Sequence, residues 1–389
     1  MKFFSSDSHI IEPPDLWTSR IEPRYRDRAP HVERQDGVDW WIIDGARYGS
    51  VSGRKNKEGG RAKDAAPVPS RGAVLVHSRF EDVRDSVWKP EAYVRENLED
   101  GVEISFVLPT QGCVLYGLED RGLFGAICRG YNDWIADFCK VVPDRLKGAA
   151  MINVYDPDEA VNELTRAKRM GLSAGIISVY PGPEISYDHP RYERLWAAAE
   201  ELDMPLSMHS LTNYNGPYSV AFEKMTHSLR ANADYWIRMS VSDMIFGGVF
   251  ERHPRLKIIS TEHEGGWVPY LLWQMDWIYE RRIVRRGIQT QLRRKPSEVF
   301  RDHVFVAVIF DQPAIQARDT IGVGNLLWGT DFPHDQSTHP RSREVASEIL
   351  AGLTPEELDA VCYGNMARIF GIDTPPTSIP AAPAGPAAS

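Results

Sequence analysis

Imidazole and carboxylate side chains stand where four short runs of mostly apolar residues end, at widely separated places in the chain. They are Asp7, His9, His209, His263 and Asp331. Each run has the length of a buried strand, so these side chains would be displayed at strand ends. Carboxylates and imidazoles gathered in this way are ligands that divalent metals take in proteins. The ordered set therefore predicts a metal centre, although no single member would do so alone.

Asp7 and His9 alternate along one run, with Ser8 between them. Side chains two positions apart lie on the same face of a strand, so this carboxylate and imidazole would project into the same space. If the run is the first strand of a barrel, both lie at its carboxyl end, where barrel active sites are found. The alternative is that Asp7 caps a turn and His9 is an ordinary buried histidine.

His209 follows the run 204–208 and leads into a polar loop at 210–216, which is typical of a pocket lining. His263 lies within 261–267, beside two glycines that permit close backbone approach. A histidine titrates near neutral pH, so His263 beside a metal suits general acid or base catalysis. For His209 the alternative is a core or loop histidine without chemistry.

Asp331 ends the run 325–330 and is followed at once by Phe332 and a proline. Its alternative role is to cap a following helix. His334 and His339 come close behind, and we expect His334, rather than His339, to be the one that reaches the active site.

Helical and strand periods alternate through the middle of the chain. A helix opens after Asp156 and ends at Gly171, and a strand at 175–180, a helix near 188–203 and the strand before His209 follow. This alternation implies a parallel sheet covered by helices. Further strands are predicted at 102–108, 304–309 and 326–328. The 389 residues exceed the ~250 of a typical (β/α)₈ barrel, which leaves room for one such domain with insertions.

Two regions depart from the alternation. Residues 28–90 contain a hairpin pattern with a two-residue turn at Asp44-Gly45, then a loop rich in glycine and basic residues at 53–64. We interpret 28–90 as an insertion after the first strand that covers the active-site mouth. The segment 373–389, rich in proline and alanine, cannot bury enough apolar surface to order itself. We therefore expect one domain over 1–372 and a disordered tail.

The net charge of −9 argues against nucleic acid or an anionic membrane as a partner and favours solubility. The expected partner is a small-molecule substrate. The four cysteines show no close pairing, so neither a disulfide framework nor a CxxC site is expected. The start of the chain lacks a signal-peptide pattern and no run is long enough to span a membrane, which predicts a cytoplasmic protein. The basic cluster within 280–295 is interpreted as a solvated helix face or a subunit contact.

The pattern GxSxG of serine hydrolases occurs at Gly171–Gly175. That pattern requires a strand before the serine and a helix after it. Here the predicted helix comes first and the predicted strand follows, so we interpret the match as accidental.

The succession of four motifs resembles the amidohydrolase superfamily. The motifs are Asp7-Ser8-His9, Met208-His209, Glu262-His263-Glu264-Gly265-Gly266-Trp267 and Gly329-Thr330-Asp331-Phe332-Pro333-His334. More narrowly, they resemble the branch that contains aminocarboxymuconate-semialdehyde decarboxylase and resorcylate-type decarboxylases. The resemblance covers residues 1 to about 372, except for much of the insertion.

The resemblance implies a distorted (β/α)₈ TIM barrel, an α/β fold, that holds one divalent metal. Zinc is the preferred metal, with manganese or iron as alternatives. The implied ligands are Asp7, His9, His209 and Asp331, and the implied acid–base residue is His263, assisted by Asp331. The usual first motif is His-x-His or Glu-x-His, so the aspartate at position 7 is a departure from it.

Because the side chain of Asp7 is short, Glu12 is an alternative ligand or a neighbour of the ligands. His334 and Trp267 are candidates for contact with substrate. The resemblance also implies a homodimer.

We therefore expect an enzyme, and our preferred reaction is metal-dependent, non-oxidative decarboxylation of an unsaturated or aromatic carboxylic acid. The alternative is a metal-dependent hydrolase of an amide, ester, lactone or C–C bond, which would use the same residues. A third hypothesis is a catalytically inactive barrel that serves as a binding protein.

Overall fold

A computed structural model describes residues 1–51, 79–182, 184–213 and 227–372. Eight parallel strands form one sheet in the order β1-β5-β6-β7-β8-β9-β10-β11. Their bounds are β1 Phe3–Ile10, β5 Val102–Pro109, β6 Leu146–Met151, β7 Ala174–Ile177, β8 Leu206–His209, β9 Ile258–Thr261, β10 Val304–Val308 and β11 Leu326–Trp328. A parallel bridge between Ser8 and Phe332 joins the first strand to the chain after the last, so the sheet closes into the predicted (β/α)₈ barrel.

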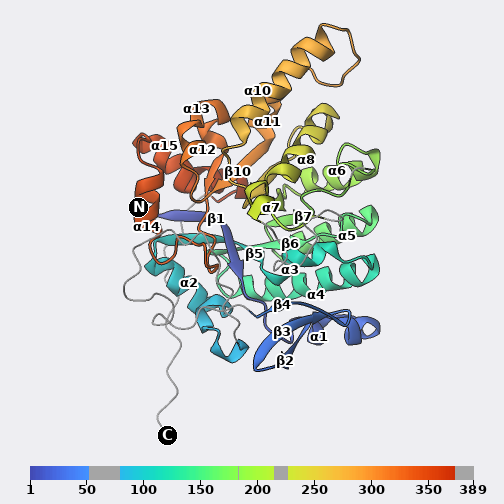
Figure 1. Cartoon of the computed structure of the whole chain (residues 1–389), viewed down its shortest axis with the longest axis vertical. Helices are drawn as coiled ribbons and strands as arrows, with labels where there is room; N and C mark the ends of the chain where they lie inside the picture. Colours follow the sequence, from blue (N-terminus) through green and yellow to red (C-terminus); the bar gives the residue numbers. More distant parts are fainter. Residues whose placement is uncertain (52–78, 183, 214–226, 373–389) are drawn as a thin grey trace.

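Helices surround the strands (Figure 1). The longer ones are α2 Pro90–Glu99, α4 Arg121–Lys140, α5 Pro157–Arg169, α6 Glu193–Glu201, α8 Tyr235–Phe246, α10 Val268–Ile278, α11 Pro296–His303 and α14 Ser342–Ile349. Shorter ones are α1 Leu16–Arg20, α3 Gln111–Val114, α7 His227–Ala231, α9 Val249–Arg252, α12 Gln312–Gln316, α13 Arg318–Ile321, α15 Pro355–Asp359 and α16 Asn365–Phe370. Strand β10, for example, is buried along its whole length, as expected for a parallel sheet with covered faces.

Side-chain caps explain where several helices begin. As predicted, a helix, α5, opens after Asp156: the Asp156 carboxylate accepts a hydrogen bond from the backbone N–H of Glu159, and Pro157 occupies the first helical position. At α15, Thr354 and Glu357 form a reciprocal capping box. The helix before Gly171 and the strand after it confirm that the GxSxG match has the wrong structural order for a nucleophile.

The strand predicted at 175–180 ends earlier, at Ile177. Beyond it the backbone N–H of Val179 bonds to the Thr212 hydroxyl, and the Ser178 hydroxyl donates to the Thr212 carbonyl. These contacts with the loop after β8 turn the chain away from the sheet. The next helix, α6, spans Glu193–Glu201 and is preceded by a 3₁₀ turn, so it is shorter than the predicted 188–203.

A separate antiparallel sheet follows β1 and is formed by β2 His31–Gln35, β3 Val38–Ile43 and β4 Ala46–Ser50. The predicted turn at Asp44-Gly45 is confirmed, with φ values of 51° and 74° that suit a type I′ hairpin. The rest of the expected insertion, at 52–78, and the predicted tail lie outside the described residues, so coverage of the active-site mouth stays a prediction. In the part of the chain that the structure describes, no helix is long and apolar enough to cross a membrane.

Candidate metal centre

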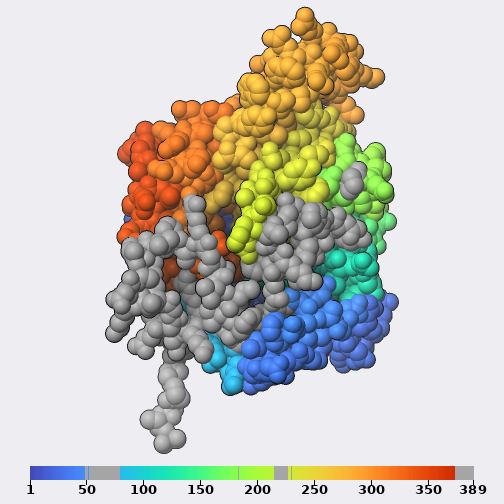
Figure 2. Space-filling view, in the orientation of Figure 1, coloured from blue at the N-terminus to red at the C-terminus, as the bar shows by residue number. Residues whose placement is uncertain are grey.

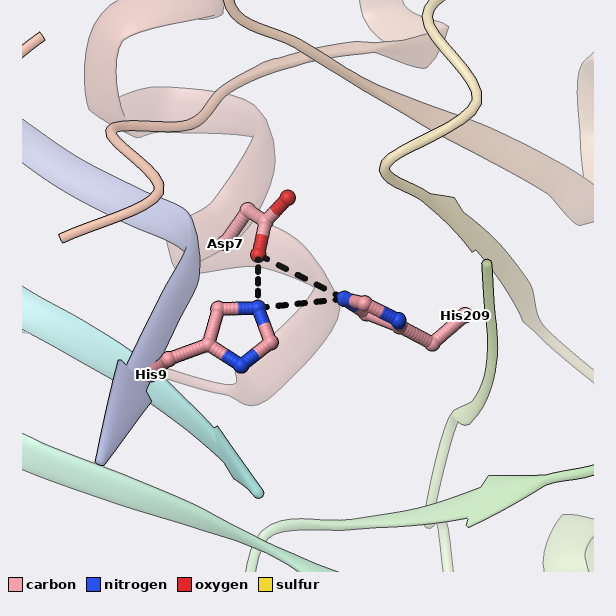
Figure 3. Close-up of side chains that lie close together, drawn as sticks. All are labelled: Asp7, His9 and His209. Carbon is pink, nitrogen blue, oxygen red and sulfur yellow. Dashed lines mark hydrogen bonds and ion pairs between the residues drawn. The ribbon is translucent and has the colours of Figure 1, made fainter. Parts of the chain in front are cut away.

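Three of the predicted side chains converge at the carboxyl ends of β1 and β8 (Figure 3). Nε2 of His9 lies 3.1 Å from Nε2 of His209 and 3.3 Å from Oδ1 of Asp7. Nε2 of His209 lies 4.0 Å from the same Asp7 oxygen. All three residues are buried. Residues 200 positions apart are thus brought within bonding distance of a single point.

The contacts of Nδ1 in the His9 and His209 rings show which ring nitrogen carries the hydrogen. Nδ1 of His9 lies 2.9 Å from the carbonyl oxygen of Pro109, and Nδ1 of His209 lies 2.7 Å from that of Ser210. A carbonyl can only accept a hydrogen bond, so each Nδ1 carries a hydrogen. Each ring, when neutral, then presents a lone pair at Nε2, and the two lone pairs face one another. A cation between them would relieve this arrangement, and a carbonyl-bound Nδ1–H is the usual support for a metal-ligating histidine.

The Asp7 carboxylate lacks a hydrogen-bond partner of its own. Neither of its oxygens has one among the described residues, although both are buried. Burial raises the pKa of Asp7, and the nearby His209 and His334 oppose that rise. A buried carboxylate without hydrogen bonds is costly unless it meets a cation. The donor set of two imidazoles and a carboxylate therefore fits a divalent metal such as zinc, manganese or iron.

Asp331 and His334 flank this point on its β11 side. Oδ1 of Asp331 lies 3.6 Å from Nε2 of His9 and accepts a 2.7 Å hydrogen bond from Nδ1 of His334. Asp331 has a φ of 55°, and the next described helix begins only at Ser342, so the N-cap alternative is not what the structure shows. Nε2 of His334 lies 3.1 Å from the Thr110 hydroxyl. Although burial alone would lower the pKa of His334, Asp331 and the other carboxylates raise it to about 9.

His263 follows β9 and is buried, with 6% of its surface exposed. Its Nδ1 lies 3.2 Å from the Ser260 hydroxyl, while its Nε2 has no hydrogen-bond partner among the described residues. Burial, and secondarily the charge of His209, lower the pKa of His263 to about 3. The ring is therefore neutral at physiological pH.

Glu12 does not lie at the point where the histidines meet. Its carboxylate accepts three hydrogen bonds, from the backbone N–H groups of Thr110, Gln111 and Gly112 at the start of α3. Burial raises the pKa of Glu12 to about 7, against the effect of these bonds. Since the adjacent Pro109 carbonyl is the partner of His9, Glu12 holds the loop that orients a candidate ligand.

Trp267 is directed toward the helical layer. Its indole N–H donates to the Glu264 carbonyl, and its ring packs edge-on against Phe300 of α11, with centroids 6.4 Å apart. The contacts of Trp267 that the structure records thus give no support to its role as a substrate contact.

Sequence reasoning missed two neighbours of His209. Oε2 of Glu262 lies 3.0 Å from Nε2 of His209, and Sγ of Cys113 lies 3.7 Å from Nδ1. Although burial alone would lower the pKa of His209, Cys113 and Glu262 raise it, so in the metal-free protein Nε2 can carry a proton that a metal would displace.

Glu262 stands immediately after β9, at a φ of 60°, and burial raises its pKa to about 7. Its position directly after a strand could have identified Glu262 as a candidate site residue from the sequence. Cys113 lies in α3, and no pattern in the surrounding sequence indicated that it would lie near His209.

The chain belongs to the amidohydrolase family, whose model matches residues 64–372. That range includes His209, His263 and Asp331 but not Asp7 and His9, which the barrel itself brings to the other ligands. The family resemblance predicted from the motifs is thus confirmed.

The chain is also similar to the following three proteins. The gamma-resorcylate decarboxylase of Rhizobium radiobacter is 26% identical over 298 residues, covering 70% of this chain and 84% of its own. The crystal structure of an amidohydrolase from Mycobacterium avium subsp. paratuberculosis is similar with a TM-score of 0.77 at 21% identity, covering 96% of this chain and 98% of its own. A dihydroxybenzoic acid decarboxylase from Polaromonas, with bound manganese and 2-nitroresorcinol, has a TM-score of 0.61 at 20% identity, covering 76% and 91%.

Proposed function

We propose that residues 1–372 form a metal-dependent decarboxylase that removes CO₂ from an aromatic carboxylic acid without oxidation. The observation that carries this proposal is the convergence, in an amidohydrolase barrel, of two imidazole Nε2 atoms and the Asp7 carboxylate, which has no hydrogen-bond partner among the described residues. The curated relatives named above support decarboxylation as the reaction, because gamma-resorcylate decarboxylase is similar over most of the chain.

The proposed ligands are Asp7, His9, His209 and Asp331. Zinc and manganese both suit this donor set, and the Polaromonas protein is described with manganese. When bound, the metal supplies the positive charge that holds the substrate carboxylate and an adjacent oxygen and offsets charge as the C–C bond breaks. Glu262, 3.0 Å from His209, is close enough to contact the substrate or the metal.

The residues around the ligands would move the proton that replaces CO₂ on the ring carbon. His334, whose pKa is about 9, holds a proton at Nδ1, 2.7 Å from Oδ1 of Asp331. Asp331 can receive this proton and deliver it to the ring carbon. Nε2 of His263 has no hydrogen-bond partner among the described residues, so we assign it the role of a base that accepts a proton there from the substrate or from water.

A panel of hydroxybenzoates, muconates, amides and lactones would test the reaction. Purified protein is incubated with each compound and manganese or zinc, and CO₂ release is measured beside loss of the substrate. We expect CO₂ from at least one hydroxybenzoate. Turnover of an amide or lactone without CO₂ would favour the hydrolase alternative, which uses the same residues.

Metal analysis tests the site independently of the substrate. We expect close to one equivalent of divalent metal in the purified protein, or tight binding on titration after chelation. The His209→Ala variant should lose this metal, because it removes one of the two facing nitrogens. Absence of binding in the unaltered protein would refute a metal centre and with it both enzymatic hypotheses.

A further inference from the structure

The loops that follow β9 and β10 are joined by two carboxylates, each of which binds the backbone of the other loop. The Glu264 carboxylate, after β9, accepts hydrogen bonds from the two backbone N–H groups of residues 309–310, at 3.0 and 3.2 Å. The Asp311 carboxylate, after β10, accepts hydrogen bonds from the two backbone N–H groups of residues 265–266. These four hydrogen bonds, defined here as the reciprocal clamp, tie the two loops together.

The backbone of the β9 loop lies directly against β10 at Gly265. A Cβ atom at this position would lie 3.1 Å from Cγ1 of Val306 and 3.2 Å from Cβ of Ala314. Because both separations are shorter than ordinary van der Waals contact, a side chain here would push the loop away from β10. The close approach brings the backbone N–H of Gly265 to Asp311, whose other oxygen caps α12 by accepting a hydrogen bond from the backbone N–H of Ala314.

His263 stands between two residues whose backbone is in the left-handed region. The φ values of Glu262 and Glu264 are 60° and 55°. A residue other than glycine adopts this conformation at a cost in free energy, so it persists only where surrounding contacts hold it. The reciprocal clamp supplies such contacts at Glu264 itself. The ring has few of its own: Nδ1 lies 3.2 Å from the Ser260 hydroxyl, and Nε2 has no hydrogen-bond partner among the described residues. The direction of Nε2 therefore depends on the backbone on either side of His263.

The β9 loop leads directly into α10, and the far end of this helix is not held by the barrel. Helix α10 begins at Val268 and continues into the π-helical segment η7, Tyr279–Val284, in which no residue is buried. The space-filling view shows this end standing clear of the body (Figure 2). A helix attached to the body at one end transmits its movement to the loop before it. Because the reciprocal clamp binds the chain between His263 and α10, it separates the ring from that movement.

We propose that Glu264 and Asp311 are positioning residues for His263, and that the reciprocal clamp fixes the direction in which its Nε2 points. This inference rests on the proposed function, in which His263 is a base, and it holds equally for the hydrolase alternative. Among the described residues, neither carboxylate forms a hydrogen bond or an ion pair with a candidate metal ligand, so both act through the loop. A misplacement of about 1 Å in a catalytic group can lower a rate about 100-fold.

Amide hydrogen exchange in the metal-free protein tests the clamp without a substrate. Glu264→Ala removes the acceptor of the amides of residues 309–310, so those amides should exchange faster in any case. The clamp predicts in addition that the amides of residues 265–266 exchange at least about tenfold faster, although Asp311 is unchanged, because their loop is released. Unchanged exchange at 265–266 would show that the two carboxylates act independently, and the proposal would be wrong. A pH of about 8.5 keeps Glu264 ionised, since burial raises its pKa to about 7.

A double-mutant cycle on turnover tests whether Glu264 acts through His263. Glu264→Ala should lower kcat about 100-fold, while KM and the Kd for metal change less than about threefold. In the His263→Asn background the same substitution should have no further effect, because the group that it positions is gone. An equal loss of kcat in both backgrounds would contradict the positioning role. Glu264→Gln keeps one carbonyl acceptor and should recover at least about tenfold of the loss, and it takes the place of the alanine variant if that variant does not fold.

Asp276→Ala is the matched control. The Asp276 carboxylate joins α10 to α11 by accepting hydrogen bonds from the backbone N–H and the hydroxyl of Ser297. Its loss should lower stability as Glu264→Ala does, and should leave both kcat and the exchange at 265–266 unchanged. A fall in kcat as large as that of Glu264→Ala would reduce the effect of the clamp to stability and refute the proposal. Turnover of an amide or lactone without CO₂ would refute the decarboxylase alone, and the cycle would then be measured on that substrate. Release of CO₂ with an additive cycle would refute the positioning role alone.

Discussion

Replacement of Asp7 by asparagine distinguishes a metal ligand from a structural carboxylate. In the metal-free protein, the two roles predict changes of opposite sign in the free energy of unfolding. Both Asp7 oxygens are buried without a hydrogen-bond partner among the described residues. A buried polar group left unpaired costs about 1–3 kcal/mol. The amide introduced by Asp7→Asn could donate to the lone pair of His9, whose Nε2 lies 3.3 Å from Oδ1. We therefore expect the free energy of unfolding of the metal-free variant to equal or exceed that of the unaltered protein, by up to about 1–3 kcal/mol.

The pH dependence of the free energy of unfolding tests the same expectation a second time. Burial raises the native pKa of Asp7 above its ordinary value of 3.8, so the metal-free native state binds this proton more tightly than the unfolded state does. The associated stability is complete below pH 3.8 and is lost as the pH rises through the raised native pKa. The amide of the variant does not titrate. The advantage of Asp7→Asn should therefore grow with pH across this window.

Bound metal stabilises the unaltered protein more than the variant. Loss of a charged ligand should weaken metal binding at least about 100-fold, or about 2.7 kcal/mol. At a metal concentration 100 times the Kd of the unaltered protein, that protein gains about 2.7 kcal/mol and the variant only about 0.4 kcal/mol. Urea unfolding of chelated and manganese-loaded samples measures both gains, and calorimetric titration measures Kd directly.

Asp100→Asn serves as the structural control. Asp100 is buried just before the amino end of β5 and accepts hydrogen bonds from the backbone N–H and hydroxyl of Ser342, whereas the histidines lie at the carboxyl ends of their strands. Its replacement should lower the stability of both forms equally and leave metal affinity unchanged. If Asp7→Asn behaves in the same way as this control, Asp7 is a structural carboxylate and the reasoning from its unpartnered oxygens is wrong.

Three further predictions follow from the same geometry. His263→Asn should retain metal and lose about 10²–10⁴-fold in kcat, because it removes Nε2, which has no hydrogen-bond partner among the described residues and is assigned to accept a proton; full activity in a decarboxylation assay would remove it from the mechanism. His334→Gln should lower kcat at least about tenfold while metal affinity stays nearly unchanged, because it removes the proton held beside Asp331; a parallel loss of metal would instead make His334 a ligand. For Glu12, whose native pKa is about 7 against an ordinary 4.5, the associated stability is complete below pH 4.5 and is lost as the pH rises through 7. Urea unfolding at about pH 5.5 and about pH 8.5 should show this loss, of about 1–3 kcal/mol, in the unaltered protein and not in Glu12→Gln, and equal pH dependence in both would exclude Glu12 as its source.

Local patterns in the sequence were sufficient for many of the elements, although barrel strand β6, Leu146–Met151, was not among those predicted. The proline after Asp156, the turn at Asp44-Gly45 and the capping box at Thr354 act within a few residues, so each could be predicted without the rest of the chain. Strand ends were less certain. Strand β7 stops at Ile177 because of hydrogen bonds to Thr212, which belongs to another βα unit.

The identities of the candidate site residues could likewise be predicted, because each stands where a strand ends. Their separate roles could not. Glu12 was an alternative ligand in the sequence, yet its carboxylate is bound to backbone N–H groups about 100 positions away. Nothing in the sequence singled out Glu262 beside His263. It lies near His209 only because β8 pairs with β9 in the folded barrel.

The sequence by itself thus determined which side chains are available, on which strands they lie and at which end of the barrel they emerge. Only the tertiary structure decided which atoms carry protons and which lack partners. The tautomer of His9 depends on the Pro109 carbonyl, and the isolation of Asp7 depends on everything packed around it. The physical reason is that hydrogen bonding and desolvation depend on neighbours in space, and a closed barrel brings those neighbours from strands hundreds of residues apart.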